Sequence, residues 1–168
     1  MTPVVAFWIA AGIAVFCTAM TITGRNPVHA LLYLIVSLLA LAVIFFLLGA
    51  PFAAVLEVIV YAGAIMVLFV FVVMMLNLGD VSQQENKLLG WRIWIGPGIL
   101  SAALLAELFV LMHDGTLAAG GVPTAVGTEV TAKQVGIALY GPYLLAVELA
   151  SMLLLGALVA AYHLGRHE

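Results

Sequence analysis

The sequence predicts an all-α integral membrane protein with about five transmembrane helices, and two observations lead to this fold class. Hydrophobic residues make up 66% of the 168 positions and charged residues 8%, whereas soluble domains have about 45 to 50% apolar and about 25% charged residues. Several charge-free runs also reach the roughly 20 residues that a helix needs to cross a hydrocarbon core of about 30 Å. A soluble domain of this length could not bury so much apolar surface.

The first three helices are expected at about 4–22, 28–48 and 52–78, with turn-forming residues between them. Turn formers and the charge of Arg25 follow the first apolar run, and a charge of this kind stays near water. Pro51 suits the first position of a helix and disfavours helical geometry at the residue before it. We therefore expect a tight turn just before the third helix.

The fourth helix is expected at about 93–112, after a polar stretch at 79–90 that is typical of a solvated loop. Trp91 and Trp94 at its start are amphipathic aromatic residues of the kind that mark a membrane interface. The chain is therefore expected to re-enter the membrane close to these two residues.

The fifth helix is expected at about 136–164, after a loop at 113–135 that is rich in glycine, threonine and alanine. Gly141 and Pro142 lie near the beginning of this last helix. Together the five helices are expected to form a single transmembrane domain over residues 1–168.

The distribution of basic residues predicts the orientation of the chain in the membrane. With five spans, one side of the membrane carries Arg25, Lys87, Arg92 and Arg166, whereas the other carries only Lys133. Because basic residues are enriched on the cytoplasmic side, the N-terminus is expected in the periplasm and the C-terminus in the cytoplasm.

Composition also excludes several classes of function. The formal net charge is −3 and no basic cluster is present, so nucleic acid is not an expected partner. Cys17 is the single cysteine, which excludes an intrachain disulfide and a multi-cysteine iron–sulfur site. His29 and His163 lie near helix ends and lack the multiple histidine, cysteine or carboxylate neighbours that are expected of a metal or haem site. We therefore expect no metal or cofactor in this chain.

Two glutamates, Glu57 and Glu148, lie well inside expected helices. A charged side chain at the centre of a membrane helix costs roughly 2.5 to 3.5 kcal/mol on insertion scales, and such residues often serve ion or proton pathways. Both are therefore candidates for proton relay. The alternative is that each bonds a neighbouring helix or reaches an interface. Glu107, near the end of the fourth helix, is expected at the interface.

Small residues follow Glu57 in the third helix. Tyr61 is one helical turn after Glu57, and Ala62, Gly63 and Ala64 come next. Gly63 disfavours a regular helix by about 1 kcal/mol relative to alanine, which makes a local irregularity plausible there. The alternative is simple packing of small residues against a neighbouring helix.

Three stretches of the sequence resemble one known family. They are NPVHALLYL at 26–34, EVIVYAGAIMVLFVFVVMML at 57–76, and GPY followed by VELASML within 141–153. Together they are similar to the family of subunit J of bacterial NADH:quinone oxidoreductase, the counterpart of chain 6 of mitochondrial complex I. The resemblance extends over nearly the whole chain.

The resemblance implies a membrane-arm subunit of the respiratory chain in the bacterial inner membrane, without a redox centre of its own. FMN and iron–sulfur clusters would belong to partner subunits, and quinone would bind only near neighbouring subunits. The other membrane-arm subunits and membrane lipid would be its partners. Two alternatives stay open: a structural scaffold in the same complex, and a membrane subunit of a related antiporter or hydrogenase complex.

The resemblance also implies roles for particular residues. The third helix would carry a hinge or π-bulge at Tyr61, Ala62 and Gly63. Glu57, Tyr61 and Glu148 would belong to a proton path that couples quinone reduction to proton translocation, with Glu57 beside a line of buried acidic residues and water.

Overall fold

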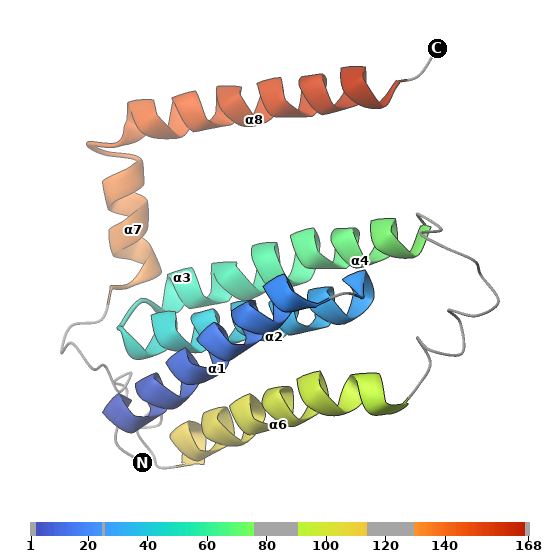
Figure 1. Ribbon diagram of the computed structural model, residues 1–168. Helices are drawn as coiled ribbons and strands as arrows, with labels where there is room; N and C mark the ends of the chain where they lie inside the picture. Colours follow the sequence, from blue (N-terminus) through green and yellow to red (C-terminus); the bar gives the residue numbers. More distant parts are fainter. Residues whose placement is uncertain (1–2, 25, 76–90, 114–129, 167–168) are drawn as a thin grey trace. The chain divides into compact units, whose positions relative to one another are not determined.

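The computed structural model describes residues 3–24, 26–75, 91–113 and 130–166, without the side chains of 91–93 and 112. Over these ranges the protein is helical and holds no strand. The helices are α1 (Pro3–Thr23), α2 (Pro27–Leu47), α3 (Pro51–Leu56), the π-helix η1 (Glu57–Ile65), α4 (Met66–Met75), α6 (Trp91–His113), α7 (Ala132–Leu139) and α8 (Leu144–Gly165). Figure 1 shows their order along the chain.

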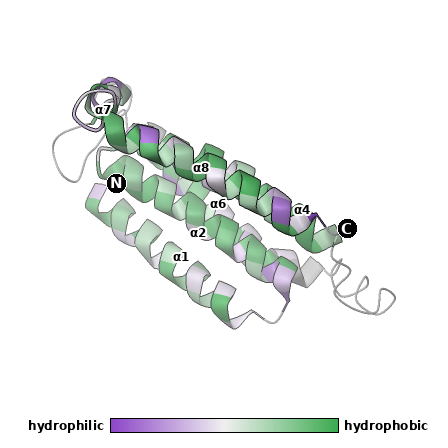
Figure 2. Ribbon diagram, turned by 90° about the horizontal axis from the view of Figure 1, so that it is seen from above, coloured by the Kyte–Doolittle hydropathy of each residue, from purple (hydrophilic) through white to green (hydrophobic). Residues whose placement is uncertain are grey.

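Five helical segments are long and apolar enough to cross a membrane, which confirms the expected all-α membrane fold. They are Pro3–Thr23, Pro27–Leu47, Pro51–Met75, Trp94–Leu111 and Leu144–Gly165. Hydrophobic residues cover most of the length of these helices (Figure 2). The orientation of the termini stays a prediction.

The first, second and fourth segments begin and end close to the expected positions, and the third begins close to its expected position. Three expected features fall outside the described residues: the end of the third helix at 78, the polar stretch 79–90, and most of the loop 113–135. The chain divides into two compact units, Met1–Glu129 and Val130–Glu168, and each is described by itself.

In the first unit, α1 packs closely against α2 because α1 presents small side chains to it (Figure 1). Ala6, Ala10 and Cys17 are fully buried along this face. Small residues allow helix backbones to approach closely in membranes, where interhelical hydrogen bonds add further stability. The Ser37 hydroxyl lies 2.9 Å from the Thr18 hydroxyl and donates to the Ala14 carbonyl at 3.1 Å. The two helices therefore form a tightly joined hairpin.

The expected turn between the second and third helices is present. Gly49 has a φ of 83°, a left-handed conformation that glycine adopts without a steric penalty. Its N–H bonds the Phe46 carbonyl and the next N–H, of Ala50, bonds the Phe45 carbonyl. These two bonds make the Schellman motif that ends many helices. Pro51 then takes the first position of α3, so the chain reverses within three residues.

α6 approaches the Tyr33 side chain of α2 closely at Gly96. A Cβ atom added there would fall on the hydroxyl of Tyr33, whose ring is buried. The ring of Tyr33 also packs edge-on against His29, with 4.8 Å between centroids. The phenol is therefore held from both sides and has little room to move.

We expect Gly96→Ala to separate α6 from α2 and to lower stability by about 1 to 3 kcal/mol, the usual effect of overpacking. The midpoint of thermal unfolding of the purified protein in detergent measures this. Gly98→Ala is the matched control, because a Cβ at Gly98 meets no atom within 4 Å among the described residues. Equal midpoints for the two variants would contradict the expected contact.

The second unit differs from the single helix expected at 136–164. The structure has α7 and α8 separated by a turn at 140–143. Pro142 has no N–H to donate and disfavours helical geometry at the residue before it, so the helix is interrupted here. α7 also begins four residues earlier than expected. Thr131 and Gln134 form a reciprocal capping box that fixes this start.

Candidate functional site

The candidate site is built around Glu57, which the sequence places inside the third transmembrane segment. Glu57 follows α3 directly and is the first residue of η1, about a turn and a half after Pro51. Its side chain is only 9% exposed, although the residues on either side of it are exposed. α2 packs against both α3 and η1. The burial of Glu57 therefore comes from the side of the helix that faces the rest of the first unit.

Hydrogen bonding is of the π type from Glu57 to Ile65, a range that contains Tyr61, Ala62 and Gly63. The segment ends where the N–H of Met66 reaches back to the Tyr61 carbonyl, five residues earlier. π-helices are rare, and when they interrupt α-helices they are frequently at functional sites. Regular α-helix precedes and follows the segment. The third transmembrane segment is thus divided in its interior.

Gly63 is well suited to the π geometry. A Cβ atom at this position would lie 3.1 Å from the Val58 carbonyl oxygen, five residues earlier in the same helix. This distance is tighter than nearly all observed Cβ contacts. Glycine therefore allows the widened turn to form without displacing a backbone carbonyl.

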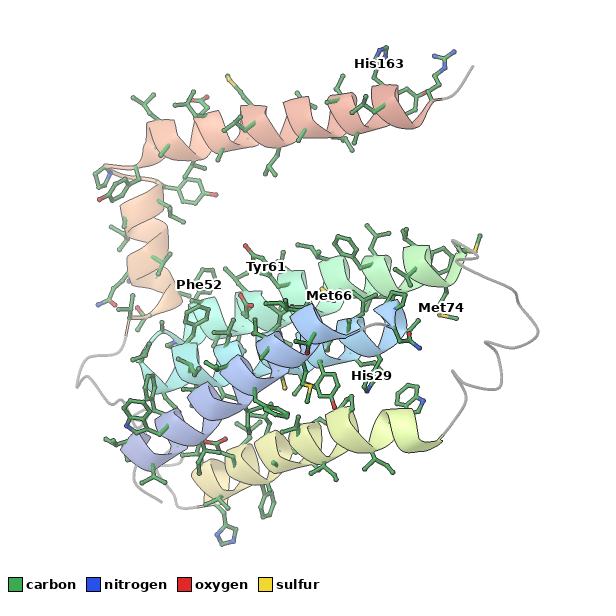
Figure 3. The ribbon with its side chains drawn as sticks, in the orientation of Figure 1. His29, Phe52, Tyr61, Met66, Met74 and His163 are labelled. Atoms are coloured by element: carbon green, nitrogen blue, oxygen red, sulfur yellow. The ribbon has the colours of Figure 1, made fainter. Side chains whose placement is uncertain are left out.

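Tyr61 and Glu57 do not meet in the structure. The Tyr61 side chain is 51% exposed, whereas Ala62 and Met66 are buried. Figure 3 shows Tyr61 on the outer side of this helix and Met66 on the side nearer α2. No hydrogen bond joins Tyr61 to Glu57 among the described residues. Their proposed shared role in a proton path stays a prediction.

Glu148 lies in α8, in the second unit, and its side chain is exposed there. The Ser151 hydroxyl donates a hydrogen bond of 2.7 Å to the backbone carbonyl of Glu148. Since the two units are described separately, Glu148 and Glu57 are not brought together by these observations. A joint role for the two carboxylates also stays a prediction.

Glu107, which the sequence places near the membrane interface, is buried within the first unit, and its depth in the membrane stays a prediction. Its side chain is only 5% exposed, and neither carboxylate oxygen has a hydrogen-bond partner among the described residues. The sequence carries a signal that could have shown this. Leu104 and Leu111, three residues before and four after Glu107, place it on the apolar face of α6 that packs into the unit.

An apolar groove of about 480 Å³ lies between α3 and η1 on one side and α6 on the other, over α2. Its walls include Ala54 and Val58 on the first side and Leu104 and Leu108 on the second. Each of the two buried glutamates, Glu57 and Glu107, is therefore a near neighbour in sequence of residues that line this groove.

Metal ligation finds no support in the parts of the chain that the structure describes. They contain no group of three or more histidine, cysteine, aspartate or glutamate side chains that could hold a metal ion. His29 contacts the ring of Tyr33, and Cys17 is buried in the apolar core between α1 and α2.

The fold and this site define a polytopic helical membrane protein with two buried carboxyl groups, one of which begins a π-helical segment. Comparison with known proteins gives the family. Residues 17–164 match the model of the NADH-ubiquinone/plastoquinone oxidoreductase chain 6 family, and the chain belongs to this family. The resemblance found in the sequence is confirmed.

Relatives named NADH-quinone oxidoreductase subunit J match over almost the full length of the chain. The protein from Pseudomonas aeruginosa is 64% identical over 165 residues, which are 97% of this chain and 96% of the relative. The Escherichia coli protein is 56% identical over 165 residues, 97% of this chain and 86% of its own length. The Rhodobacter capsulatus protein is 39% identical over 163 residues, 94% of this chain and 79% of its own length.

Proposed function

We propose that the chain is a membrane subunit of a proton-translocating NADH:quinone oxidoreductase and that its third transmembrane segment takes part in coupling. Membership of the chain 6 family and the names of its relatives support the assembly. The observation that carries the coupling role is the buried carboxyl of Glu57 at the start of a π-helical segment. The protein is a multi-pass protein of the bacterial inner membrane.

The chain acts on protons and not on electrons in this proposal. NADH oxidation and electron transfer would take place on FMN and iron–sulfur clusters of partner subunits, and quinone would bind near neighbouring subunits. The N-terminus would lie in the periplasm and the C-terminus in the cytoplasm, as the basic residues predict. The exposed apolar surfaces of α4 and α8 would be covered by other membrane-arm subunits and by lipid.

Glu57 would bind and release protons beside a path of water and acidic residues. The π segment would change between widened and regular geometry, because Gly63 accepts the widened turn and regular helix continues on both sides. A change of one helical turn from widened to regular geometry would rotate the residues before the segment relative to the residues after it. That rotation would make or break the proton path next to Glu57.

Native separation of mild-detergent membrane extracts tests the assembly. A tagged copy of the chain is expected to migrate with the band that oxidises NADH in the gel. Migration of the chain alone, away from that activity, would overturn the proposed assembly. The chain could then belong to a related antiporter or hydrogenase complex. The subunits that are purified together with the tagged chain would identify that complex.

A scaffold role is distinguished from coupling by substitution. If Glu57 and Glu148 serve assembly, their glutamine variants lose the complex itself. If they serve coupling, the complex assembles and its proton translocation falls. Both quantities are measured on the same preparation.

A further inference from the structure

Glu107 is a buried carboxyl group that the proposed function does not use. Both of its oxygen atoms are shielded from solvent and lack a hydrogen-bond partner among the described residues. It lies six residues before His113, the last residue of α6. At the usual helical rise, this places Glu107 about 9 Å from the end of the helix. Buried polar groups are almost always hydrogen-bonded, so a carboxyl without a partner requires an explanation.

The surroundings of Glu107 are apolar. On the same face of α6, Leu104 belongs to one buried apolar cluster with residues of α1 and α2, and Leu111 belongs to a second. Between these two levels α1 contributes Ala10, which is fully buried and carries only a methyl group. The first cluster contains two titratable side chains, Cys17 and Tyr33, and the second contains none. α1 carries no basic residue, and the basic residue of α2, His29, packs on Tyr33 at the level of Gly96, eleven residues before Glu107.

The apolar groove lies between the helices that carry Glu107 and Glu57, although neither glutamate lines it. Leu104 and Leu108 line the groove from α6, and they are three residues before and one residue after Glu107. Ala54 and Val58 line it from α3 and η1, and they have the same spacing around Glu57. Glu107 and Glu57 thus have the same sequence spacing to residues that line opposite walls of one groove.

We propose that Glu107 is a second proton-binding carboxyl group of this chain, which exchanges its proton with water that enters the groove between α6 and η1. This rests on the proposed coupling function and extends it to a second helix. With the groove dry, Glu107 is held as the neutral acid, since an ionised carboxylate without a partner is far more costly to bury than a neutral one. When the groove is hydrated, water accepts the proton.

The groove has the properties that such a gate needs. A water molecule occupies about 30 Å³ in the liquid, so a groove of this size has room for several. Its lining is almost wholly aliphatic, and hydrophobic constrictions in membrane proteins open and close by wetting and drying. A movement of η1 against α6 would widen or narrow the groove. The same movement would then control the access of water to both carboxyl groups.

The experiment measures the number of protons moved per electron by the whole complex in proteoliposomes, together with its thermal stability. Glu107→Gln and Glu107→Leu remove the exchangeable proton, and both are expected to lower the ratio severalfold. Their thermal midpoints are expected to equal or exceed that of the wild type, because replacing an unpartnered buried acid removes an unfavourable group. Glu107→Asp keeps a carboxyl and is expected to recover part of the ratio. Ala106→Leu, on the exposed face of α6, is the matched control and should translocate protons normally.

Two results would overturn the inference. Wild-type proton translocation in both Glu107→Gln and Glu107→Leu would show that the carboxyl is not needed. Lower thermal stability and poor assembly of both variants would show that Glu107 holds a partner in the complex and is not a neutral acid. Glu57→Gln measured in parallel separates the two proposals. If Glu57→Gln lowers proton translocation and the Glu107 variants do not, only the inference about Glu107 is overturned. Normal translocation in Glu57→Gln overturns the role proposed for Glu57.

Discussion

Replacement of Glu57 by glutamine is expected to lower the coupled NADH:quinone reductase rate about tenfold, which corresponds to about 1.4 kcal/mol of added barrier. Glutamine keeps the size and hydrogen-bonding capacity of the side chain but cannot bind and release a proton. Because Glu57 is buried where α2 packs against η1, an isosteric substitution should leave the packing intact. The rate is measured in membrane vesicles with a soluble quinone.

The control for this prediction is the rate of NADH oxidation by an artificial acceptor that takes electrons from the peripheral arm. That rate should not change, since the chain is proposed to carry no redox centre. Glu57→Asp should retain part of the coupled rate because it keeps a carboxyl. A full coupled rate in an assembled Glu57→Gln complex would contradict the prediction.

Substitution of Gly63 by leucine is expected to remove most of the coupled activity while the complex still assembles. The new Cβ would lie 3.1 Å from the Val58 carbonyl in the π geometry, so it disfavours the widened turn. Loss of glycine also favours regular helix by about 1 kcal/mol, close to a fivefold change in an equilibrium between the two forms. Both effects hold the segment in regular geometry. Gly63→Ala should show the same change to a smaller degree.

The matched control for Gly63 is Gly12→Leu. Gly12 also lies in a transmembrane helix, but its surroundings within 4 Å are open among the described residues. Its leucine variant should keep the wild-type rate. If Gly63→Leu assembles and retains full coupled activity, the change of geometry in the third segment is not part of coupling.

Local chemistry made much of the fold predictable. The apolar runs gave the five membrane-spanning segments, and the combination of Gly49 with Pro51 gave a turn that the structure confirms as a Schellman motif. The break at Pro142 was foreseen only as a feature near the start of a continuous helix. The capping box of Thr131 and Gln134 is a local signal for the start of α7, and it was overlooked.

The candidate site was less predictable because burial depends on which helix face meets a neighbour. Position along the chain placed Glu57 inside the third segment and Glu107 near the end of the fourth, but it did not show that the Glu107 side chain is buried. The apolar side chains one turn on either side of Glu107 decide its burial, and they depend on the packing of α6 against α1 and α2. The exposure of Tyr61 likewise follows from the π segment, whose changed periodicity moves residues around the helix.

The number of protons moved per electron in proteoliposomes that contain the Glu57→Gln complex tests the coupling role most directly. Electron transfer to quinone is followed at the same time, so that the ratio does not depend on the amount of enzyme. A ratio well below that of the wild type, in a complex that assembles fully, is the predicted result. A wild-type ratio in that complex would contradict the role of this chain in coupling and would favour a scaffold.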